Sequence, residues 1–576
     1  MSLGLKQAGF SVLAGADYDA YSVGTHKANI GGLGYLGDLG DPSDFLRHLD
    51  AWGISRVDLV AGGVPCQPFS RAGRSKIRSL VRDNARPAED DRILLWRALV
   101  EVVAYLRPKA VLLENVPDLA VWDSGTVLAS LREQLSVQGY SSTVAVLGAC
   151  DFGVPQHRER LFLVALEPGR PFQWPKPLDG HSTLRDAIGD LPEVPPAQRE
   201  ERVAYEGPHS DLQRALRVGV PPEDCGWVYD HITRDLRVDD AEAFAFLRPG
   251  ESYAHLPQRL QRYRSDIFSD KYYRLRWDSV SRSITAHIAK DAYWYIHPDQ
   301  NRTLSIREAA RLQTFPDWFR FSGEPSHRFR QIGNAVPPLL GRAIGAQIVE
   351  ALAAPRARAR KQPAGCFRAR IMDWHVTNPG PQFWRRGGYE PWPVLLAESL
   401  LARTRPSQLR ARYDALVKAT PTPTRTLQDP AMREVLADAG LERFGPRIRD
   451  LAQEVVSKHG GKVPDKLADL IGLRGVTPLA ASAVLTFAFR QHSLLVTAGT
   501  ERVIRRFCGT ASLGRWEPWT RLYDLAGLGG ADSEFNDALA SLALTICRSG
   551  VPGCADCPVS IECSSVLAGS LQSMRP

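Results

Sequence analysis

The first 165 or so residues alternate between two hydrophobic patterns. Short apolar runs of four to six residues are separated by longer stretches in which apolar residues recur every three or four positions. The short runs are typical of buried strands and the longer stretches of helices that cover them. We predict strands at 11–16, 58–61, 110–113 and 161–166, and therefore an α/β sheet.

The pattern changes twice further along the chain. Residues 168–270 are rich in Pro, Arg and Gly with little periodicity, which predicts an irregular insertion. Regular patterning returns at 283–296 and in a helical pattern at 305–314, and a further helix follows Pro337. Beyond a basic, Pro- and Ala-rich linker, the chain is almost wholly helical in pattern. We divide it into segments 1–167, 168–270, 271–352, 353–365, 366–546 and 547–563.

Composition narrows the class of protein. The chain has 576 residues, 44% of them hydrophobic, which is enough for several packed domains. Its net charge of +8 favours an anionic partner such as double-stranded DNA. The apolar runs are shorter than the ~20 residues that a membrane span needs, and the N-terminus shows no secretory pattern. We expect a cytoplasmic protein with no membrane partner.

Cys66 is the first candidate for chemistry. It lies in a Val-Pro-Cys-Gln-Pro-Phe-Ser string directly after the predicted strand at 58–61. A thiol displayed on a rigid turn can act as a nucleophile, whereas a buried cysteine is an inert apolar filler. The cysteine alone does not decide between these two alternatives.

The full string resembles the nucleophile loop of the DNA cytosine-5 methyltransferases. Three further segments resemble motifs of the same family and follow in the family's order: Glu-Asn-Val at 114–116, Gln-His-Arg-Glu-Arg at 156–160 and Gly-Asn-Ala-Val-Pro-Pro at 333–338. The resemblance covers most of residues 1–350. It implies a Rossmann-like methyltransferase fold in which 168–270 is the target-recognition region.

The family resemblance assigns catalytic roles. Cys66 would add to carbon 6 of cytosine, because carbon 5 is a poor nucleophile until the ring becomes enamine-like. Glu114 would supply a proton at ring nitrogen 3, and Arg158 and Arg160 would supply fixed positive charge beside it. The target base must be flipped out of the duplex to reach these groups.

S-adenosylmethionine is the implied methyl donor. By resemblance, Asp17 would bind the ribose hydroxyls, Tyr18 would lie against the adenine and Asp38 would meet the adenine amino group. Asn334, in the last motif, is assigned to the same cofactor site.

One family feature is not found in the printed sequence. Family members open with a strand and a Phe-x-Gly-x-Gly turn, and the printed chain begins just past the position of that turn. A misassigned start, a second polypeptide or a decayed enzyme would each explain this, and the first is favoured. We expect the first strand of the sheet to be missing, its two neighbours to have unpaired backbone groups, and the cofactor to bind weakly.

Four cysteines near the end of the chain form a second candidate site. Cys547, Cys554, Cys557 and Cys563 follow a C-x6-C-x2-C-x5-C spacing, and such clustering without an export signal indicates a metal site rather than disulfides. Four thiolates can hold zinc or an iron-sulfur cluster. The spacing resembles the [4Fe-4S] loop of the helix-hairpin-helix DNA glycosylases of the endonuclease III and adenine-mismatch type.

That second resemblance spans about 370–565 and implies an all-α domain with an incomplete catalytic set. Residues 473–481 resemble the DNA-binding hairpin, with Leu479 where lyase-type members have a lysine. Thr497 stands where the family has its catalytic aspartate. Glu398 matches the glutamate that protonates the leaving base in adenine-mismatch members. One carboxylate of the pair is present and one is absent.

Three functions remain open at this point. The first is transfer of a methyl group to carbon 5 of cytosine in DNA through a Cys66 adduct, with the C-terminal half as a DNA-binding module. The second is a mismatch glycosylase, acting on T:G or a related pair in base excision repair, with a vestigial methyltransferase half. The third has both halves as non-catalytic DNA binders. The first would place the protein in restriction-modification, with a cognate endonuclease as partner.

Overall fold

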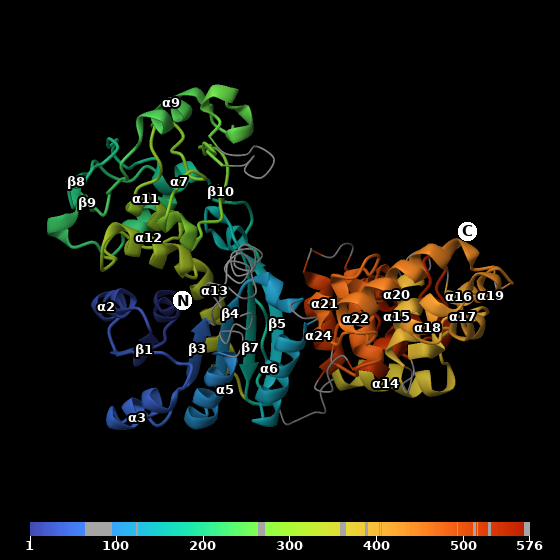
Figure 1. The fold of residues 1–576 in the computed structure, drawn as a ribbon. Coiled ribbons are helices and arrows are strands. Elements are labelled where there is room, and N and C mark those ends of the chain that lie inside the picture. Colours follow the sequence, from blue (N-terminus) through green and yellow to red (C-terminus); the bar gives the residue numbers. More distant parts are fainter. Residues whose placement is uncertain are drawn as a thin grey trace.

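The computed structural model places most of the chain (Figure 1). It describes residues 1–568 except 64–94, 122–124, 263–270, 357–363, 386–389, 402, 403, 405, 439, 492, 511–513, 515 and 528–531. Cys66 lies outside the described residues. No helix in the described part of the chain is both long and apolar enough to cross a membrane.

A four-stranded sheet forms the centre of the N-terminal half. Its strand order is β3-β4-β7-β5, with β3 parallel to β4 and the other two pairs antiparallel. The strands are β3 (Leu59–Gly63), β4 (Ala110–Asn115), β7 (Glu159–Leu166) and β5 (Ser141–Gly148). In β4 and β7 nearly every residue is buried, as their continuous apolar sequences predict for strands covered on both faces.

Two helical layers cover this sheet. On β4, Ala110 and Leu112 pack into one apolar cluster while Val111 and Leu113 pack into another, because successive side chains of a strand point to opposite faces. One cluster takes side chains from α1 (Ser2–Gln7) and α13 (Pro338–Ala353). The other takes them from α5 (Leu95–Leu106) and α6 (Thr126–Val137).

A second, two-stranded sheet lies beside the first. β1 (Ala14–Asp17) pairs in parallel with β2 (Leu33–Leu36), and α2 (Ala20–Asn29) connects the two strands. Among the described residues, β1 has no partner other than β2, and β3 has none other than β4. The sheet is therefore in two pieces, as expected for a fold in which the strand between β1 and β3 is missing.

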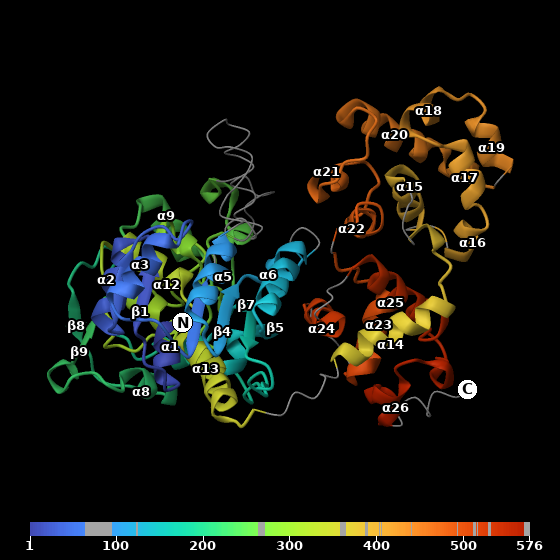
Figure 2. The same ribbon diagram turned by 90° about the horizontal axis from the view of Figure 1, so that it is seen from below.

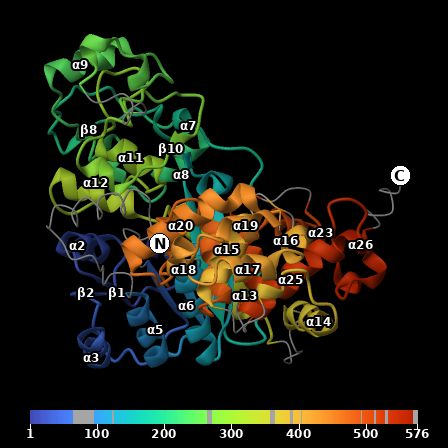
Figure 3. The ribbon, with the colours of Figure 1, turned by 45° about the vertical axis from the view of Figure 1, so that its right-hand side comes forward.

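Residues from about 168 to 334 form a separate lobe. It contains short elements joined by long irregular segments: α7 (Leu184–Ile188), β8 (Arg202–Ala204), α8 (Asp211–Arg217), β9 (Trp227–Tyr229), α9 (Val238–Phe246), β10 (Ser281–Arg282), α11 (Ile306–Leu312) and α12 (Pro325–Asn334). Figure 3 shows this lobe at the top, with the helical half in front of the catalytic sheet. The segment 283–296, for which regular structure was predicted, holds only a short 3-10 turn at Ala286–Ala289, so that prediction was wrong.

Buried ion pairs hold this lobe together. All seven residues of α11 are buried, among them Arg307 and Arg311. Arg311 binds Asp190 and Asp317, and Arg307 binds Asp230. Charged side chains therefore replace part of the apolar core that a lobe with so little regular structure would otherwise need.

The C-terminal half is helical and has two apolar clusters (Figure 2). One cluster joins α15 (Pro391–Leu401), α20 (Gly445–His459) and α22 (Pro478–Phe487). The other joins α14 (Ala364–Thr377), α23 (Ala498–Cys508), α24 (Glu517–Ala526) and α25 (Ser533–Thr545). The remaining described helices are α16 (Pro406–Arg410), α17 (Tyr413–Ala419), α18 (Pro423–Gln428), α19 (Met432–Asp438), α21 (Leu467–Ile471) and α26 (Ser564–Leu567).

The two halves pack together through α24 and the edge strand β5. Apolar residues of α14, α24 and α25 belong to the same buried cluster as apolar residues of α5, α6 and the sheet. Tyr523 on α24 is buried, and its hydroxyl donates a hydrogen bond to the carbonyl oxygen of Gly125 (2.8 Å). The Asp524 carboxylate accepts a hydrogen bond from Thr143 (3.3 Å) and pairs with Arg132 (3.5 Å). The helical half therefore covers the edge of the sheet that β5 would otherwise expose.

Candidate functional site

Glu114 and Arg160 form an ion pair where β4 and β7 lie side by side. Glu114 pairs in register with Phe162, so that Arg160, two residues away on β7, projects on the same side of the sheet. The Nε atom of Arg160 is 2.9 Å from Oε1 of Glu114, and both side chains are only 13–14% exposed. The structure thus brings together two of the predicted catalytic residues.

Glu114 also lies next to the end of β3. Gly63, the last residue of β3, pairs with Glu114, and a Cβ atom at Gly63 would stand 3.4 Å from its Oε2 atom. Gly63 is three residues before Cys66 in the sequence. The strand that leads to the predicted nucleophile therefore ends beside the predicted acid.

Arg158 is placed differently from Arg160. It is 1% exposed, and its guanidinium donates hydrogen bonds to the carbonyl oxygens of Ile284 (2.6 Å), Gly333 (3.1 Å) and Ala335 (2.9 Å). The Ile284 carbonyl lies in the lobe, and the Gly333 and Ala335 carbonyls lie at the end of α12. Arg158 therefore connects the Gln-His-Arg-Glu-Arg segment to two parts of the lobe. This geometry gives Arg158 a positioning role.

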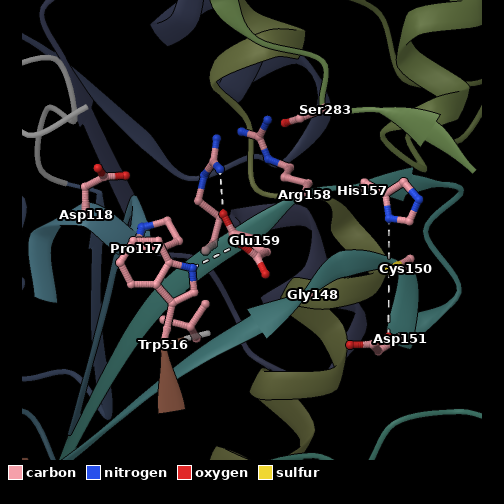
Figure 4. A pocket seen from close by; sticks show the side chains of 12 residues that line it. Pro117, Asp118, Gly148, Cys150, Asp151, His157, Arg158, Glu159, Ser283 and Trp516 are labelled. Carbon is pink, nitrogen blue, oxygen red and sulfur yellow. Dashed lines mark hydrogen bonds between the residues drawn. The ribbon is translucent and has the colours of Figure 1, made fainter. Parts of the chain in front are cut away.

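A cleft of about 620 Å³ opens over this segment (Figure 4). Its lining includes Arg158, Glu159 and Arg160 from β7 and its approach, and one residue of the helical half, Trp516. The indole Nε1 of Trp516 donates a hydrogen bond to Oε2 of Glu159 (3.1 Å). The C-terminal half therefore contributes a side chain to the rim of the methyltransferase-like site.

A larger cavity of about 700 Å³ lies between β1 and β3. Asp17, Tyr18 and Asp38, three of the residues predicted to bind the cofactor, line it. Burial raises the pKa of the Asp17 carboxyl above its ordinary value. Asn334, the fourth, is exposed at the end of α12 and is not among the lining residues.

Comparison with known proteins assigns the N-terminal half. The model of the C-5 cytosine-specific DNA methylases matches residues 1–350. The chain belongs to this family. It is 32% identical to the type II methyltransferase M.AgeI of Thalassovita gelatinovora, over 61% of this chain and 96% of that protein. It is 34% identical to the type II methyltransferase M.XorII of Xanthomonas oryzae pv. oryzae, over 61% of this chain and 82% of that protein.

A second comparison with solved structures gives a weaker match. A thermostable thymine-DNA glycosylase is 26% identical to this chain, covering 36% of it and 97% of that chain, with a TM-score of 0.31. A TM-score this low assigns neither fold nor function to the helical half of the methyltransferase.

The four C-terminal cysteines of this methyltransferase gather between α23 and α26. The described cysteines form no disulfide, and Cys563 is buried while the other three are partly buried. Burial raises the pKa of the Cys557 thiol to about 11, and the other three thiols add to the shift. A guanidinium hydrogen of Arg506 points at the Cys547 sulfur (3.5 Å). The donor set therefore fits a bound cation, which would favour the thiolate forms.

Glu398 is enclosed rather than exposed to a DNA base. It is 5% exposed, and both of its oxygens accept hydrogen bonds from Arg385, at 2.7 and 2.8 Å. The indole Nε1 of Trp384 donates a third hydrogen bond to Oε1 (2.9 Å). Both oxygens of Glu398 are therefore occupied by donors from within the helical half.

Two other glycosylase-motif positions have structural roles. Thr497 is the N-cap of α23 and forms a capping box with Thr500. Thr477 caps α22 in an extended conformation, while Gly475 retains a positive φ of 82°. Leu479, the second residue of α22, is 42% exposed.

Asp230 and His231 lie inside the lobe. Asp230 is 2% exposed and pairs with Arg307 and Arg328. His231 is fully buried between Ser305 and Pro192, to which its ring nitrogens are hydrogen-bonded. These residues pack the lobe and do not face DNA.

Sequence reasoning did not find Trp516, Tyr523 or Arg385. Each acts through a partner far away in the sequence or through an ion pair that no motif records. An aromatic residue in a helical segment carries no sign that it will contact another domain. Their contacts become visible only in the folded chain.

Proposed function

We propose that Cys66 attacks carbon 6 of a flipped cytosine in double-stranded DNA, and that carbon 5 then takes the methyl group from S-adenosylmethionine, which leaves as S-adenosylhomocysteine. Loss of the carbon 5 proton to water then expels the Cys66 thiolate and restores the aromatic ring. The observation that supports this most directly is the Glu114–Arg160 pair beside the end of β3. Arg160 fixes Oε1 of Glu114, and Oε2 lies toward Gly63, the last residue of β3. A carboxyl held in this way is oriented to meet ring nitrogen 3 as the adduct forms.

The cofactor belongs in the cavity between β1 and β3. Asp17 and Asp38 offer carboxylates for ribose and adenine, and Tyr18 offers a ring for stacking. Because β1 and β3 have no strand between them in the described structure, one wall of this cavity is open. We therefore expect residues 1–576 to bind S-adenosylmethionine weakly, and tight binding by calorimetry would refute that expectation.

The test is transfer of labelled methyl groups to DNA at millimolar S-adenosylmethionine, so that weak binding does not hide activity. Cys66→Ala should abolish transfer, and Glu114→Gln should lower it by about 10²-fold or more. Cys225→Ala is the matched control, because Cys225 is an exposed cysteine in the lobe. Transfer by the Cys66→Ala protein at the wild-type rate would overturn the proposal.

The relatives suggest a biological setting. Both are named as type II methyltransferases. The setting that fits such relatives is restriction-modification, in which the methyl group protects a sequence from a cognate endonuclease. Protection of methylated plasmid DNA from restriction enzymes of known specificity would identify the recognised sequence.

For the helical half we propose a DNA-binding module that carries a [4Fe-4S] cluster and excises no base. Zinc sites made of four cysteines usually have two Cys-x-x-Cys pairs separated by a longer loop, whereas Cys547, Cys554, Cys557 and Cys563 include only one such pair. This sequence spacing favours the iron-sulfur cluster over zinc.

Absence of base excision is supported by the ion pair of Glu398 and the cap at Thr497. The competing function, a T:G glycosylase, requires an acid free to reach the base. The two functions are distinguished by incubating the protein with T:G and A:G duplexes and then adding alkali, which breaks the strand wherever a base has been removed. Strand breaks that disappear in Glu398→Gln would establish the glycosylase, and an absence of breaks supports the DNA-binding module.

A further inference from the structure

A second group of potential metal ligands lies at the edge of the cleft over β7. Cys150 and Asp151 belong to a 3-10 turn at Ala149–Phe152, directly after β5. His157 lies on β6 (Gln156–His157), and His181 on the segment before α7. Three segments of chain thus bring a thiol, a carboxylate and two imidazoles to one place.

We propose that Cys150, Asp151, His157 and His181 bind a divalent cation of the zinc class. Each of the four donors is a zinc ligand in proteins, and the mixture of one sulfur with imidazole nitrogens favours zinc over calcium or magnesium. None of the four has a role in the proposed methyl transfer, and none belongs to the cysteine group near the C-terminus.

Three of the four donors already lie close enough for a tetrahedral site. Cys150, Asp151 and His181 each have a donor atom within 4.8 Å of the other two. The Sγ atom of Cys150 is 3.7 Å from Oδ1 of Asp151, and the Nε2 atom of His181 is 3.2 Å from the same oxygen. With bonds of about 2.3 Å to sulfur and about 2.0 Å to nitrogen or oxygen, a tetrahedral zinc ion requires edges of roughly 3.5 and 3.3 Å. Nδ1 of His157 is 3.9 Å from the Cys150 sulfur but lies outside the group of three, so its side chain must shift further than the others to become the fourth ligand.

The backbone around the group holds the ligands in position. The amide of Leu178 donates a hydrogen bond to the carbonyl oxygen of Asp151 (2.8 Å), which ties the segment before His181 to the turn. His157 pairs in register with Arg282 of β10. A Cβ atom at Gly148 would stand 2.8 Å from Oδ2 of Asp151, so the glycine leaves room for this carboxylate. Figure 4 shows the His157 ring turned toward Cys150.

The position of the site indicates what the ion does. His157 precedes Arg158, which joins β7 to the lobe and to the end of α12. Cys150 and Asp151 follow the edge strand β5, and His181 leads into the lobe. A cation at this point would fasten the lobe to the catalytic sheet and fix the segment that carries Arg158 and Arg160.

The decisive experiment compares zinc binding by the full-length protein and three variants, measured by competition with a chromogenic chelator. The variants are Cys150→Ser, His181→Ala and the control Cys225→Ser, which alters an exposed cysteine outside the group. The C-terminal cysteines are intact in all four proteins, so any metal that they hold cancels in the comparison. Wild type and Cys225→Ser should bind one more equivalent than the two ligand variants. Equal stoichiometry in all four proteins would overturn the proposal.

Cobalt substitution identifies the ligands themselves. Cobalt bound by one thiolate and three nitrogen or oxygen ligands should give a single-thiolate charge-transfer band, which Cys150→Ser removes and His157→Ala weakens. A band of four-thiolate intensity that persists in Cys150→Ser would place the ion at the C-terminal cysteines instead. Added zinc should raise the melting temperature of wild type and of Cys225→Ser but not of His181→Ala. A rise in all three would show that the four residues are only a hydrogen-bonded surface group.

Discussion

The residues that match catalytic motifs have different surroundings in the two halves of this methyltransferase. In the N-terminal half, Glu114 and Arg160 form an ion pair where two adjacent strands lie side by side, and Arg160 lines the cleft. In the helical half, Glu398 is locked to Arg385, and Thr497 caps a helix. Residues that match a motif border a cleft in one half and make structural contacts in the other. A motif match alone therefore does not establish function, because the surroundings of its side chains decide what they can do.

The largest expected effect is on methyl transfer, which should depend on Cys66 and not on Glu398. Cys66→Ala should reduce methyl transfer by at least about 10³-fold, because no covalent adduct can form. Glu398→Gln should leave the transfer rate per folded molecule within about twofold of wild type, because its carboxylate faces Arg385 and Trp384 and not the cleft. Labelled methyl transfer measures both. A strong loss in Glu398→Gln, in protein shown to be folded, would mean that the halves share a catalytic centre.

Removal of Arg385 should give the largest loss of stability. Arg385→Ala leaves the Glu398 charge buried without its partner, which typically costs about 3–5 kcal/mol. Arg385→Ala combined with Glu398→Ala should recover part of that loss, because no unpaired charge remains. Chemical denaturation measures the difference. Arg433→Ala, at an exposed arginine on α19, is the control and should change stability by less than about 0.5 kcal/mol.

The Glu114–Arg160 and Glu398–Arg385 pairs show which features the sequence could predict and which it could not. The strands at β4 and β7 were predictable because continuous apolar runs have few alternatives, and all four predicted strands are confirmed within three residues at each end. β5 was missed because its residues are mostly half-buried and it begins Ser-Ser-Thr. Glu114 and Arg160 were predicted from two motifs that adjoin predicted strands, and the structure adds that they form an ion pair. The Glu398–Arg385 pair depends on tertiary contacts that no local pattern encodes.

The contact between the halves can be tested at Gly125. This glycine has a φ of 87°, and a Cβ atom there would stand 2.2 Å from the Tyr523 hydroxyl oxygen. Gly125→Ala should therefore combine backbone strain of about 1–2 kcal/mol with a clash that separates α24 from the sheet. Gly139→Ala isolates the strain, because Gly139 has a φ of 92° with open space around it.

Thermal unfolding should rank Gly125→Ala below Gly139→Ala, and limited proteolysis should cut the linker at 353–365 faster in Gly125→Ala only. Equal behaviour of the two variants would show that Tyr523 does not hold the halves together. Tyr523→Phe, which removes only the hydroxyl, should have a smaller effect of about 1 kcal/mol.

The lobe should lose stability in acid in two steps. Burial lowers the pKa of His297 to about 4, so between pH 6.5 and 4 the unfolded chain binds a proton that the folded lobe excludes. Burial by itself would raise the pKa of Asp317, but Arg311, Arg307 and Arg217 together lower it to about 2. Folding therefore also excludes a proton between about pH 4 and 2. In both windows stability falls as pH falls, by at most about 1.4 kcal/mol per pH unit for each group.

Denaturation midpoints as a function of pH check this. His297→Gln should flatten the dependence between pH 6.5 and 4 and leave the step below pH 4 intact. His255→Gln is the control, because His255 is exposed in the same lobe. An unchanged slope in His297→Gln would mean that another group governs the upper window.

The smallest effect tests whether Thr497 has become purely structural. Thr497→Ala removes the side-chain oxygen that accepts a hydrogen bond from the Thr500 amide (3.1 Å), and should cost about 1 kcal/mol. Thr497→Asp keeps a good cap and restores the aspartate of the glycosylase motif, so its stability should match wild type. It should still leave T:G duplexes intact, because Glu398 remains paired with Arg385. Base excision by Thr497→Asp would show that the helical half lost its activity through this one residue, and that the comparison between the halves rests on a single substitution.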